Sequence, residues 1–349
     1  MSAKVAINIV TWNGLRYLPE LLESLDAQTY RDFVVRVIDN GSDDGTVEYL
    51  AGERPDIMLV RNVKNHGFAA AHNQAIRYAL DRWGVDELAD RYVLVANQDL
   101  ILEPDYLEKM VSEADHHPQF GSFSGKLLRA YGENMNDEYL KETVRSDRID
   151  TTGLRANRWR RFTDRGAGEL DKAQYDEDQD VFGVSGALAF YRASALADAC
   201  CRGEYFDEDF FSYKEDVDLA WRLRNLGWGA LYVPQAVAYH HRGIYGKEKV
   251  GLAGRIKDRR AKRPYFAALS TRNHWLAIMK NERWFNAVLA FPLVAPLELG
   301  RICYLVIFEP RTLWVIPSAI KLAPKIISKR RETLKRTKSK ASELRGWFR

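Results

Sequence analysis

The chain of 349 residues is long enough for one large domain with an appendage or for two modest domains. Its 46% hydrophobic and 29% charged residues exclude a disordered protein, and three cysteines exclude a disulfide framework. The net charge of +4 is uneven, because residues 320–349 carry eleven Lys or Arg and two Glu, which leaves −5 for residues 1–319. The first ten residues resemble a strand rather than a signal peptide, so a cytoplasmic protein is expected.

The first hundred residues alternate between strand and helix patterns. Apolar or β-branched runs predict four strands, and leucine or alanine residues at helical spacing predict two helices. The predicted strands cover residues 5–10, 33–38, 57–60 and 92–96, and the helices cover residues 15–25 and 68–80. Alternating strands and helices form βαβ units, so we expect an α/β fold with a mostly parallel sheet covered on both faces.

Polar side chains stand at the ends of these four strands. Thr11 and Asn13 follow the first strand, Asp39 the second, Asn65 the third and Asp99 the fourth. Ligands of open α/β sheets bind beyond the carboxyl ends of the strands, so one cleft is expected to collect these residues. The chain contains neither G-x-G-x-x-G nor G-x-x-x-x-G-K-[ST], which argues against a dinucleotide enzyme and a P-loop NTPase.

The middle of the chain loses this periodicity. Residues 128–180 are rich in charge, including five arginines between Arg155 and Arg165, and predict a long functional loop or small subdomain. Order returns with an apolar run at residues 181–191, a helix at residues 214–223 and a strand at residues 229–233. His240 and His241 come after that strand.

The C-terminal third is aromatic and apolar. Its uncharged stretch, Phe285–Leu297, is 13 residues long and contains Pro292 and Pro296. A spanning helix needs about 20 apolar residues, so helices lying in a membrane interface are favoured. The apolar neighbourhood of the basic tail favours an anionic membrane surface over nucleic acid, for which the sequence has no known motif.

Five short motifs stand in order along the chain. They are VTWN at residues 10–13, VIDNGSDDGT at 37–46, NHGFAAAHN at 65–73, NQD at 97–99 and EDVDLAWR at 215–222. In this order and spacing they resemble the family-2 glycosyltransferases of GT-A fold. Further segments resemble bacterial rhamnosyltransferases of cell-surface polysaccharide synthesis: DTTG at 150–153, DRG at 164–166, FGVSGA at 182–187 and the C-terminal segment.

The resemblance implies a GT-A domain at residues 1–245, with a Rossmann-like, mostly parallel mixed sheet flanked by helices. A helical, basic, membrane-associated region would follow at residues 246–349. It further implies an inverting, metal-dependent hexosyltransferase that moves a sugar from a nucleotide diphosphate donor to a lipid-linked or polysaccharide acceptor in cell-envelope synthesis. The sugar it suggests is L-rhamnose from dTDP-rhamnose. Peripheral attachment to the cytoplasmic face of the inner (plasma) membrane is expected.

The resemblance also implies a set of donor-binding residues. They are Thr11, Asn13, Asp39, Asn65, Gly67, Asn73 and Asn97. Asp39 matches the family carboxylate that recognises the nucleotide base. Asp-Asn-Gly-Ser favours a turn by itself, but turn chemistry does not explain polar residues at three other strand ends, so binding is preferred.

Asp99 is the expected ligand of Mg²⁺ or Mn²⁺, which neutralises a diphosphate leaving group. The chain departs from the family's Asp-x-Asp at Asn97, where an amide replaces the first carboxylate. His240 is the expected second ligand, although His241 is adjacent and a structural role stays open for both. A turn cap is the alternative role of Asp99.

Asp216 is the expected general base, which deprotonates the attacking acceptor hydroxyl, with Glu215 as the alternative. These two acids and Asp218 cannot all point the same way on a helix. Acids in a first helical turn also interact favourably with the helix dipole without any catalytic role. The arginines between Arg155 and Arg165 suit either an acceptor diphosphate or a solvated loop.

Other functions stay open beside this one. A synthase that loads a sugar onto polyprenyl phosphate would use the same donor site. A non-catalytic nucleotide-sugar binding subunit of a membrane complex would bind the donor without needing Asp216. A basic-tailed nucleic-acid protein is disfavoured.

Overall fold

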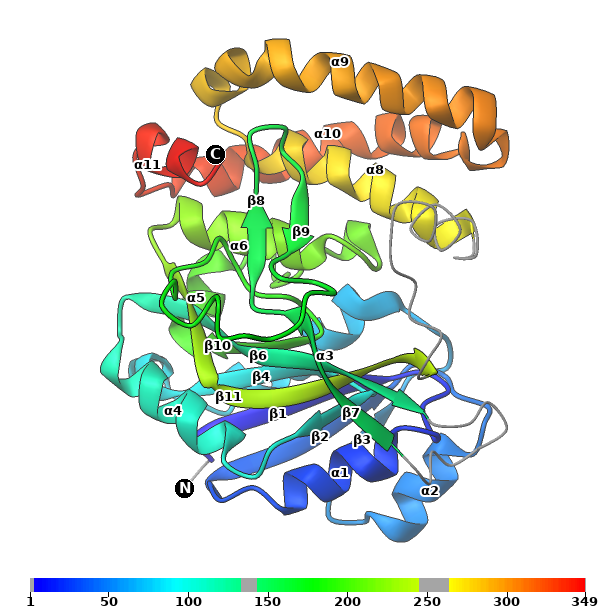
Figure 1. Ribbon diagram of the computed structural model, residues 1–349, viewed down its shortest axis with the longest axis vertical. Helices are drawn as coiled ribbons and strands as arrows, with labels where there is room; N and C mark the ends of the chain where they lie inside the picture. Colours follow the sequence, from blue (N-terminus) through cyan, green and yellow to red (C-terminus); the bar gives the residue numbers. More distant parts are fainter. Residues whose placement is uncertain (1–2, 133–142, 245–263, 349) are drawn as a thin grey trace.

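The computed structural model describes residues 3–132, 143–244 and 264–348. Within these residues a nine-stranded mixed sheet forms the centre of the molecule, in the order β3-β2-β1-β4-β10-β6-β11-β5, with β7 paired to β6 (Figure 1). Its strands are β1 (Val5–Thr11), β2 (Phe33–Asp39), β3 (Met58–Arg61), β4 (Tyr92–Asn97), β5 (Leu100–Leu102), β6 (Phe120–Gly132), β7 (Thr143–Thr151), β10 (Leu188–Arg192) and β11 (Gly229–Ile244). The α/β fold with parallel strands β1 to β4 is confirmed.

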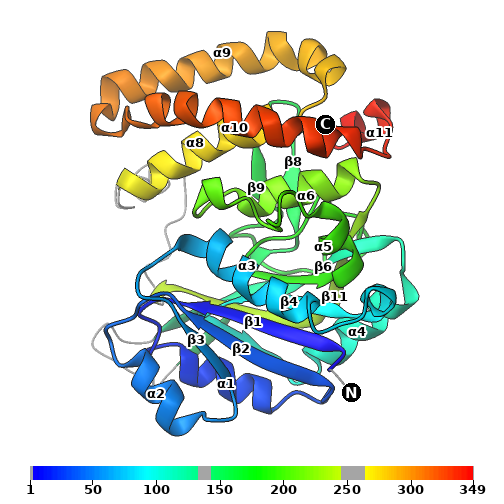
Figure 2. The same cartoon turned by 180° about the vertical axis from the view of Figure 1, so that it is seen from behind.

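Helices cover both faces of the sheet (Figures 1 and 2). Side chains alternate along β1, so Ile7 joins the core shared with α1, α2 and α4, whereas Ala6 joins the core shared with α3, α5 and α6. Helix α1 forms because four buried leucines recur at helical spacing. These helices are α1 (Leu18–Asp26), α2 (Thr46–Glu53), α3 (Gly67–Leu80), α4 (Tyr106–His116), α5 (Ala193–Ala199) and α6 (Glu215–Asn225), with the 3₁₀ turns η1 (Val85–Asp90) and η2 (Glu208–Phe210).

The charged region, predicted as a long functional loop or small subdomain, contains paired strands. Besides β7, it contains the hairpin of β8 (Leu154–Ala156) and β9 (Phe162–Asp164), which reaches toward the C-terminal helices in Figure 1. Strand pairing therefore orders this segment, although its sequence lacks the periodicity that predicts strands.

Strand β11 is longer than predicted. It continues from Gly229 to Ile244 through an irregularity between Val233 and Val237. Pro234 lies in that irregularity, where its missing N–H removes no regular ladder hydrogen bond. The two histidines expected after the strand therefore lie within it.

The C-terminal helices form a layer on the far side of α6 from the sheet (Figure 1). Helix α8 packs against α6, and α10 packs along α8. The domain boundary expected at residue 245 falls on residues 245–263, outside the described residues. The layer consists of α8 (Pro264–Asn281), α9 (Trp284–Phe308), η3 (Pro310–Thr312), α10 (Val315–Lys335) and α11 (Ala341–Gly346).

Helix α9 is longer than the 13-residue apolar run in the sequence. It is a continuous helix of 25 residues that contains Pro292 and Pro296. Its acid Glu298 is bonded to Arg301 at 3.0 Å and to Trp275 at 2.7 Å. Among the described helices, α9 alone is long and apolar enough to cross a membrane, and its apolar window is only 6% buried. The expectation that this segment is too short to span is therefore wrong on length.

Candidate active site

The carboxyl ends of the parallel strands β1, β2 and β4 lie side by side at one edge of the sheet. The strand register pairs Thr11 with Asp39 and Val10 with Asn97. The structure thus places Thr11 and Asp39, two residues that the sequence predicts for one cleft, beside Asn97 of the expected donor-binding set. This edge is where open α/β sheets bind their ligands.

Hydrogen bonds hold this edge in place. The Thr11 hydroxyl donates to Gln98 Oε1 at 2.7 Å, and the Asn13 backbone N–H donates to Ser42 Oγ at 2.9 Å. The fully buried Asp39 carboxylate accepts two backbone N–H groups of the following turn, at 3.1 and 3.2 Å. Turn chemistry therefore operates at Asp39 and fixes its carboxylate at the strand end.

The Asn65 turn contacts a distant loop. Asn65 Oδ1 accepts the Gly67 N–H at 2.8 Å, and Gly67 has a φ of +81°. A Cβ at Gly67 would lie 2.4 Å from the Phe211 carbonyl oxygen, so glycine alone fits. Farther along α3, the buried Asn73 donates to the Phe206 carbonyl and accepts the Phe206 N–H, both at 2.8 Å. Its amide is thus engaged in joining α3 to the loop before α6.

Asp99 and His240 meet at the edge of the sheet. His240 is buried, with Nε2 3.2 Å from Asp99 Oδ1 and Nδ1 2.9 Å from Asp150 Oδ2. Arg242 donates to both oxygens of Asp150, at 2.8 and 2.9 Å. The histidine is therefore held between two carboxylates, one of which is itself fixed by an arginine.

His241 has different surroundings. Successive side chains of a strand point to opposite faces, so His241 points away from Asp99. Its Nε2 lies 3.1 Å from Glu20 Oε2 on α1. The structure therefore separates two histidines that the sequence leaves equivalent.

Charge balances burial in this group. Burial by itself would lower the pKa of His240, but the charge of Asp99 and the hydrogen bonds to both carboxylates raise it to about 9. Burial would likewise raise the pKa of Asp99 and of Asp150, yet the neighbouring His240 holds both below their usual range. The pair of Asp99 and His240 is thus an ion pair at neutral pH.

The same geometry suits a divalent ion. Two ligands at about 2.1 Å from an octahedral ion lie about 3 Å apart, and Asp99 Oδ1 and His240 Nε2 are separated by 3.2 Å. The bond from Nδ1 to Asp150 would leave Nε2 as the nitrogen that could ligate an ion, as in sites where a second carboxylate orients a histidine ligand. In the described part of the chain no group of three His, Cys, Asp or Glu could hold a metal ion, so further ligands would be donor oxygens and water.

Helix α6 begins with three acids that have three different environments. Asp216 is partly exposed, and its Oδ2 accepts the Gly186 N–H at 3.2 Å. Asp218 is fully buried and paired with Lys280 at 2.9 Å. Glu215 is buried with one carboxylate oxygen lacking a hydrogen bond, and burial followed by the charge of Asp216 raises its pKa to about 8. Of the three, Asp216 alone keeps a partly exposed carboxylate.

A short segment connects Asp216 to the strand ends. Gly186 donates to Asp216, and the carbonyl of the next residue, Ala187, accepts the Asn97 N–H at 2.9 Å. Asp216 and the NQD motif are therefore hydrogen-bonded to two consecutive residues, Gly186 and Ala187, that directly precede β10.

Three polar residues at this edge are absent from the predicted set. They are Gln98, Asp150 and Asp164. Asp164 has one buried oxygen without a hydrogen bond in the described structure, and burial followed by the charges of Asp150 and Asp216 raises its pKa. All three lie inside motifs that carry the family resemblance, and those motifs were the signal by which the sequence could have identified them. Their contacts span up to 92 residues of sequence and are not visible in any local pattern.

The arginines of the middle region divide into two groups. Arg165 is buried and donates to Thr152 Oγ1 at 2.9 Å, and Arg160 is buried in an ion pair with Glu282. These two arginines stabilise the fold. The exposed ones are Arg155, Arg158 and Arg161.

The sheet topology and its strand-end carboxylates define a GT-A glycosyltransferase fold. Two solved structures share it. A crystal structure of GalNAc-T7 with UDP, GalNAc and Mn²⁺ has a TM-score of 0.54 at 12% identity, covering 80% of this chain and 48% of that chain. A crystal structure of S. aureus TarS 1-349 in complex with UDP has a TM-score of 0.51 at 15% identity, covering 98% of this chain and 91% of that chain. At such identities the likeness concerns the fold alone.

The model of glycosyl transferase family 2 matches residues 6–198, more than half of the chain. The protein therefore belongs to glycosyl transferase family 2 and is a glycosyltransferase. It is 28% identical over 246 residues to the N-acetylglucosaminyl-diphospho-decaprenol L-rhamnosyltransferase of Mycobacterium tuberculosis, covering 69% of this chain and 77% of that protein. It is 23% identical over 226 residues to the rhamnosyltransferase WbbL of Escherichia coli, covering 61% and 80%.

Proposed function

We propose that the protein is an inverting, metal-dependent glycosyltransferase that moves L-rhamnose from dTDP-rhamnose to a lipid-linked glycan acceptor. Family membership supports the transfer. The names of the two rhamnosyltransferase relatives support the sugar, and the name of the mycobacterial one supports a diphospho-polyprenol acceptor.

The observation that carries the proposal is the Asp99–His240 pair at the same sheet edge as Asp216. Asp99 and His240 would hold Mg²⁺ or Mn²⁺, with Asn97 beside them. The ion would neutralise the departing diphosphate. Asp216 would accept the proton of the acceptor hydroxyl, and attack from the face opposite the leaving group gives inversion.

The donor would lie along the strand ends. Thr11, Asn13 and Asp39 would border the nucleotide, with the fixed carboxylate of Asp39 toward the base. Asn65 and Gly67 would border it from the start of α3. Asn73 would contribute by holding the loop before α6 against α3.

We propose that the protein acts at the cytoplasmic face of the inner membrane, and the exposed side chains of α9 support attachment to a membrane. Trp284, Phe285 and Phe291 have 78%, 60% and 68% of their surfaces exposed, more than water-facing helices usually show for such residues. The basic tail is less available than its sequence suggests, because Lys329 is buried among acids of the catalytic domain. Anionic lipid would therefore meet the remaining exposed lysines and arginines.

The test is turnover of a panel of nucleotide sugars with Mn²⁺ or Mg²⁺ and a membrane lipid extract. Wild type, Asp216→Asn and Glu215→Gln are compared, with donor affinity measured for each. We expect metal-dependent use of dTDP-rhamnose that Asp216→Asn lowers by about 10²- to 10⁴-fold without loss of donor binding. The product of the transfer should have the anomeric configuration opposite to that of the donor.

Other outcomes reassign the function. Loss of turnover in Glu215→Gln alone would move the base to Glu215. Transfer to free polyprenyl phosphate would indicate a synthase. Donor binding without turnover in wild type would indicate a binding subunit, and no binding of any donor would overturn the proposal.

A further inference from the structure

The loop from Asp207 to Lys214 has an unusual backbone. Phe211, Tyr213 and Lys214 have φ values of 63°, 71° and 69°, in the left-handed region that favours glycine. Residues other than glycine keep this backbone conformation only where the surrounding structure holds them, and such residues cluster at functional sites. The loop therefore needs an external support.

The loop connects the Gly67 turn, at the candidate donor site, with the start of α6, which carries Asp216. The Phe211 carbonyl accepts the Ala69 N–H at 3.2 Å, next to the Gly67 turn. Lys214 is the residue that precedes α6, two positions before Asp216. A change in the loop would therefore move the start of α6 and the Gly67 turn together.

Helix α8 supplies the support. Asn273 is fully buried, and its Nδ2 donates to the carbonyls of Phe210, Ser212 and Tyr213 at 2.9, 2.9 and 2.7 Å. The neighbouring Arg272 adds a bond to the Asp209 carbonyl at 2.8 Å and orients the Asn273 amide through Oδ1 at 3.0 Å. The two N–H hydrogens of one amide group thus serve three carbonyls of the strained segment, with one hydrogen shared between two of them.

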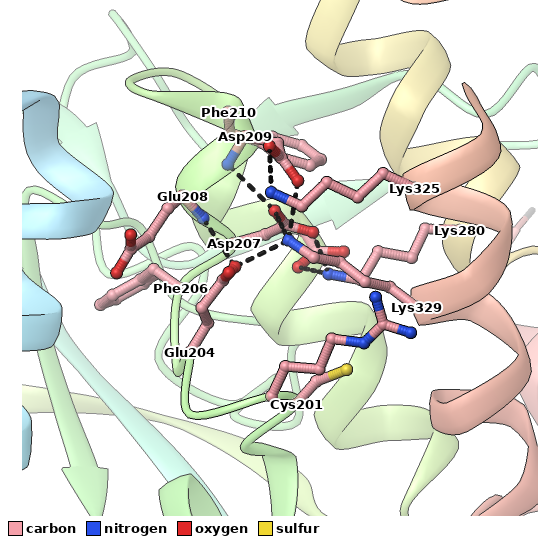
Figure 3. Close-up of polar contacts among 12 residues, drawn as sticks. Cys201, Glu204, Phe206, Asp207, Glu208, Asp209, Phe210, Lys280, Lys325 and Lys329 are labelled. Carbon is pink, nitrogen blue, oxygen red and sulfur yellow. Dashed lines mark hydrogen bonds and ion pairs between the residues drawn. The ribbon is translucent and has the colours of Figure 1, made fainter. Parts of the chain in front are cut away.

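Lysines anchor the two ends of this arrangement, as Figure 3 shows for the acidic start of the loop. Lys280 of α8 lies 2.6 Å from Asp207 and 2.9 Å from Asp218 of α6. Lys329 of α10 lies 2.6 Å from Asp207 and 2.8 Å from Asp209. Both lysine side chains are 1% exposed, so the ion pairs fix α8 and α10 firmly against the loop.

We propose that Asn273 is a positioning residue for sugar transfer. It holds the loop from Asp207 to Lys214 so that Asp216 stays against Gly186 and Phe211 stays against the Gly67 turn. The C-terminal helical layer is then part of the catalytic machinery as well as a candidate membrane attachment. The kinetic part of this inference rests on the proposed function of Asp216.

The test compares Asn273→Asp with Asn286→Asp. The first change keeps the size of the side chain but turns an N–H donor that faces three carbonyls into an acceptor. The control residue, Asn286, is 1% exposed, lies in the same helical layer and donates to one carbonyl, that of Ala341, at 2.9 Å. Both variants are assayed below their melting temperatures.

Hydrogen exchange tests the support itself and needs no activity. In Asn273→Asp the amides of residues 211–217 should exchange at least about tenfold faster than in wild type, whereas Asn286→Asp should leave them unchanged. Equal exchange of these amides in wild type and Asn273→Asp would overturn the proposal.

Kinetics test the consequence. In Asn273→Asp, kcat should fall by at least about tenfold with donor affinity within about threefold of wild type, because misplacement affects the reaction more than binding. In the Asp216→Asn background the same change should have little further effect, since both act through one group. Losses that multiply, or a kcat equal to that of Asn286→Asp, would refute the positioning role. If Asp216→Asn keeps full turnover, the proposed base is wrong, and the exchange result alone then decides whether Asn273 holds the loop.

Discussion

His240 and His241 are adjacent, yet β11 gives them different partners because its successive side chains point to opposite faces of the sheet. The acids at the start of α6 divide in the same way. Asp218 is used in a buried ion pair, whereas Asp216 keeps a partly exposed carboxylate. At the scale of single residues, therefore, contacts across the fold assign distinct roles to side chains of the same chemistry.

The two histidines should differ in metal binding. We expect His240→Asn to weaken Mn²⁺ binding by at least about tenfold, and His241→Asn to change it by less than about twofold. Mn²⁺ must displace a proton from His240, whose pKa is about 9. Affinity should therefore rise with pH by nearly tenfold per unit below pH 9 in wild type and His241→Asn, but not in His240→Asn. Titration followed by the signal of free Mn²⁺ measures this, and identical behaviour of the two variants would contradict it.

Glu215 should make the protein less stable as pH rises. Its pKa is about 8 in the folded protein, whereas an unfolded glutamate has a pKa of about 4.3. Between these values the unfolded chain releases the proton and the folded protein keeps it, so rising pH favours unfolding. Glu215→Gln removes this effect, and its melting temperature should exceed that of wild type by an amount that grows from pH 5 to pH 8, to roughly 6 °C. The exposed control Glu48→Gln should show no such trend.

Packing between elements accounts for the glycine at the start of α3. Gly67 and Gly203 both have positive φ, of +81° and +77°. An added Cβ at Gly67 would meet the Phe211 carbonyl, whereas one at Gly203 would meet nothing within 4 Å. Helix α3 and the loop before α6 therefore approach so closely that they exclude any side chain at Gly67.

These two glycines provide a matched comparison. Gly203→Ala should cost about 1 kcal/mol of unfolding free energy, from backbone conformation alone. Gly67→Ala should cost at least about 1 kcal/mol more, because the loop must shift to admit the methyl group. Urea denaturation of the two variants measures the difference, and equal losses would show that the loop yields freely.

The whole molecule consists of a catalytic sheet and a C-terminal helical layer joined by buried ion pairs. Residues 1–319 carry a net charge of −5 and residues 320–349 carry +9. Part of this opposite charge is paired inside the molecule, since Lys329 forms ion pairs with Glu204, Asp207 and Asp209. Helix α9 lies on the outer side of the layer (Figure 1), and many of its large apolar side chains are exposed.

Attachment to a bilayer should depend on α9 more than on the basic tail. Each large apolar side chain contributes about 1.5–3 kcal/mol when it leaves water, against about 1 kcal/mol for a lysine near anionic lipid. We expect the triple change Trp284→Ser, Phe285→Ser and Phe291→Ser to weaken binding to phosphatidylglycerol-containing vesicles by more than about a hundredfold. Lys321→Gln with Lys338→Gln should cause a smaller loss that high salt abolishes. Vesicle co-sedimentation measures both, and undiminished binding of the triple variant would exclude α9 as the attachment surface.

Local patterns were sufficient for most of the first hundred residues. The four strands and the helices α1 and α3 of residues 5–97 follow from periodicity, whereas α2 was not predicted. The motifs at the strand ends identify the family because each lies beside a strand that periodicity also predicts. Periodicity failed at β11, which continues through Pro234, and at α9, which continues through two prolines. In both elements, partners elsewhere in the fold hold segments whose local sequence favours a break.

The sequence by itself determined the family and the α/β fold, and it indicated Asp99, Asp216 and the two histidines as candidate site residues, because these are encoded in residue type and short spacing. Only the tertiary structure decided that His240 meets Asp99 and Asp150, that Asp218 is structural, and that Asn273 supports the loop before Asp216. Those pairings join residues 60 to 141 positions apart. Such contacts depend on how the sheet and the C-terminal helices pack, and no local pattern records that packing.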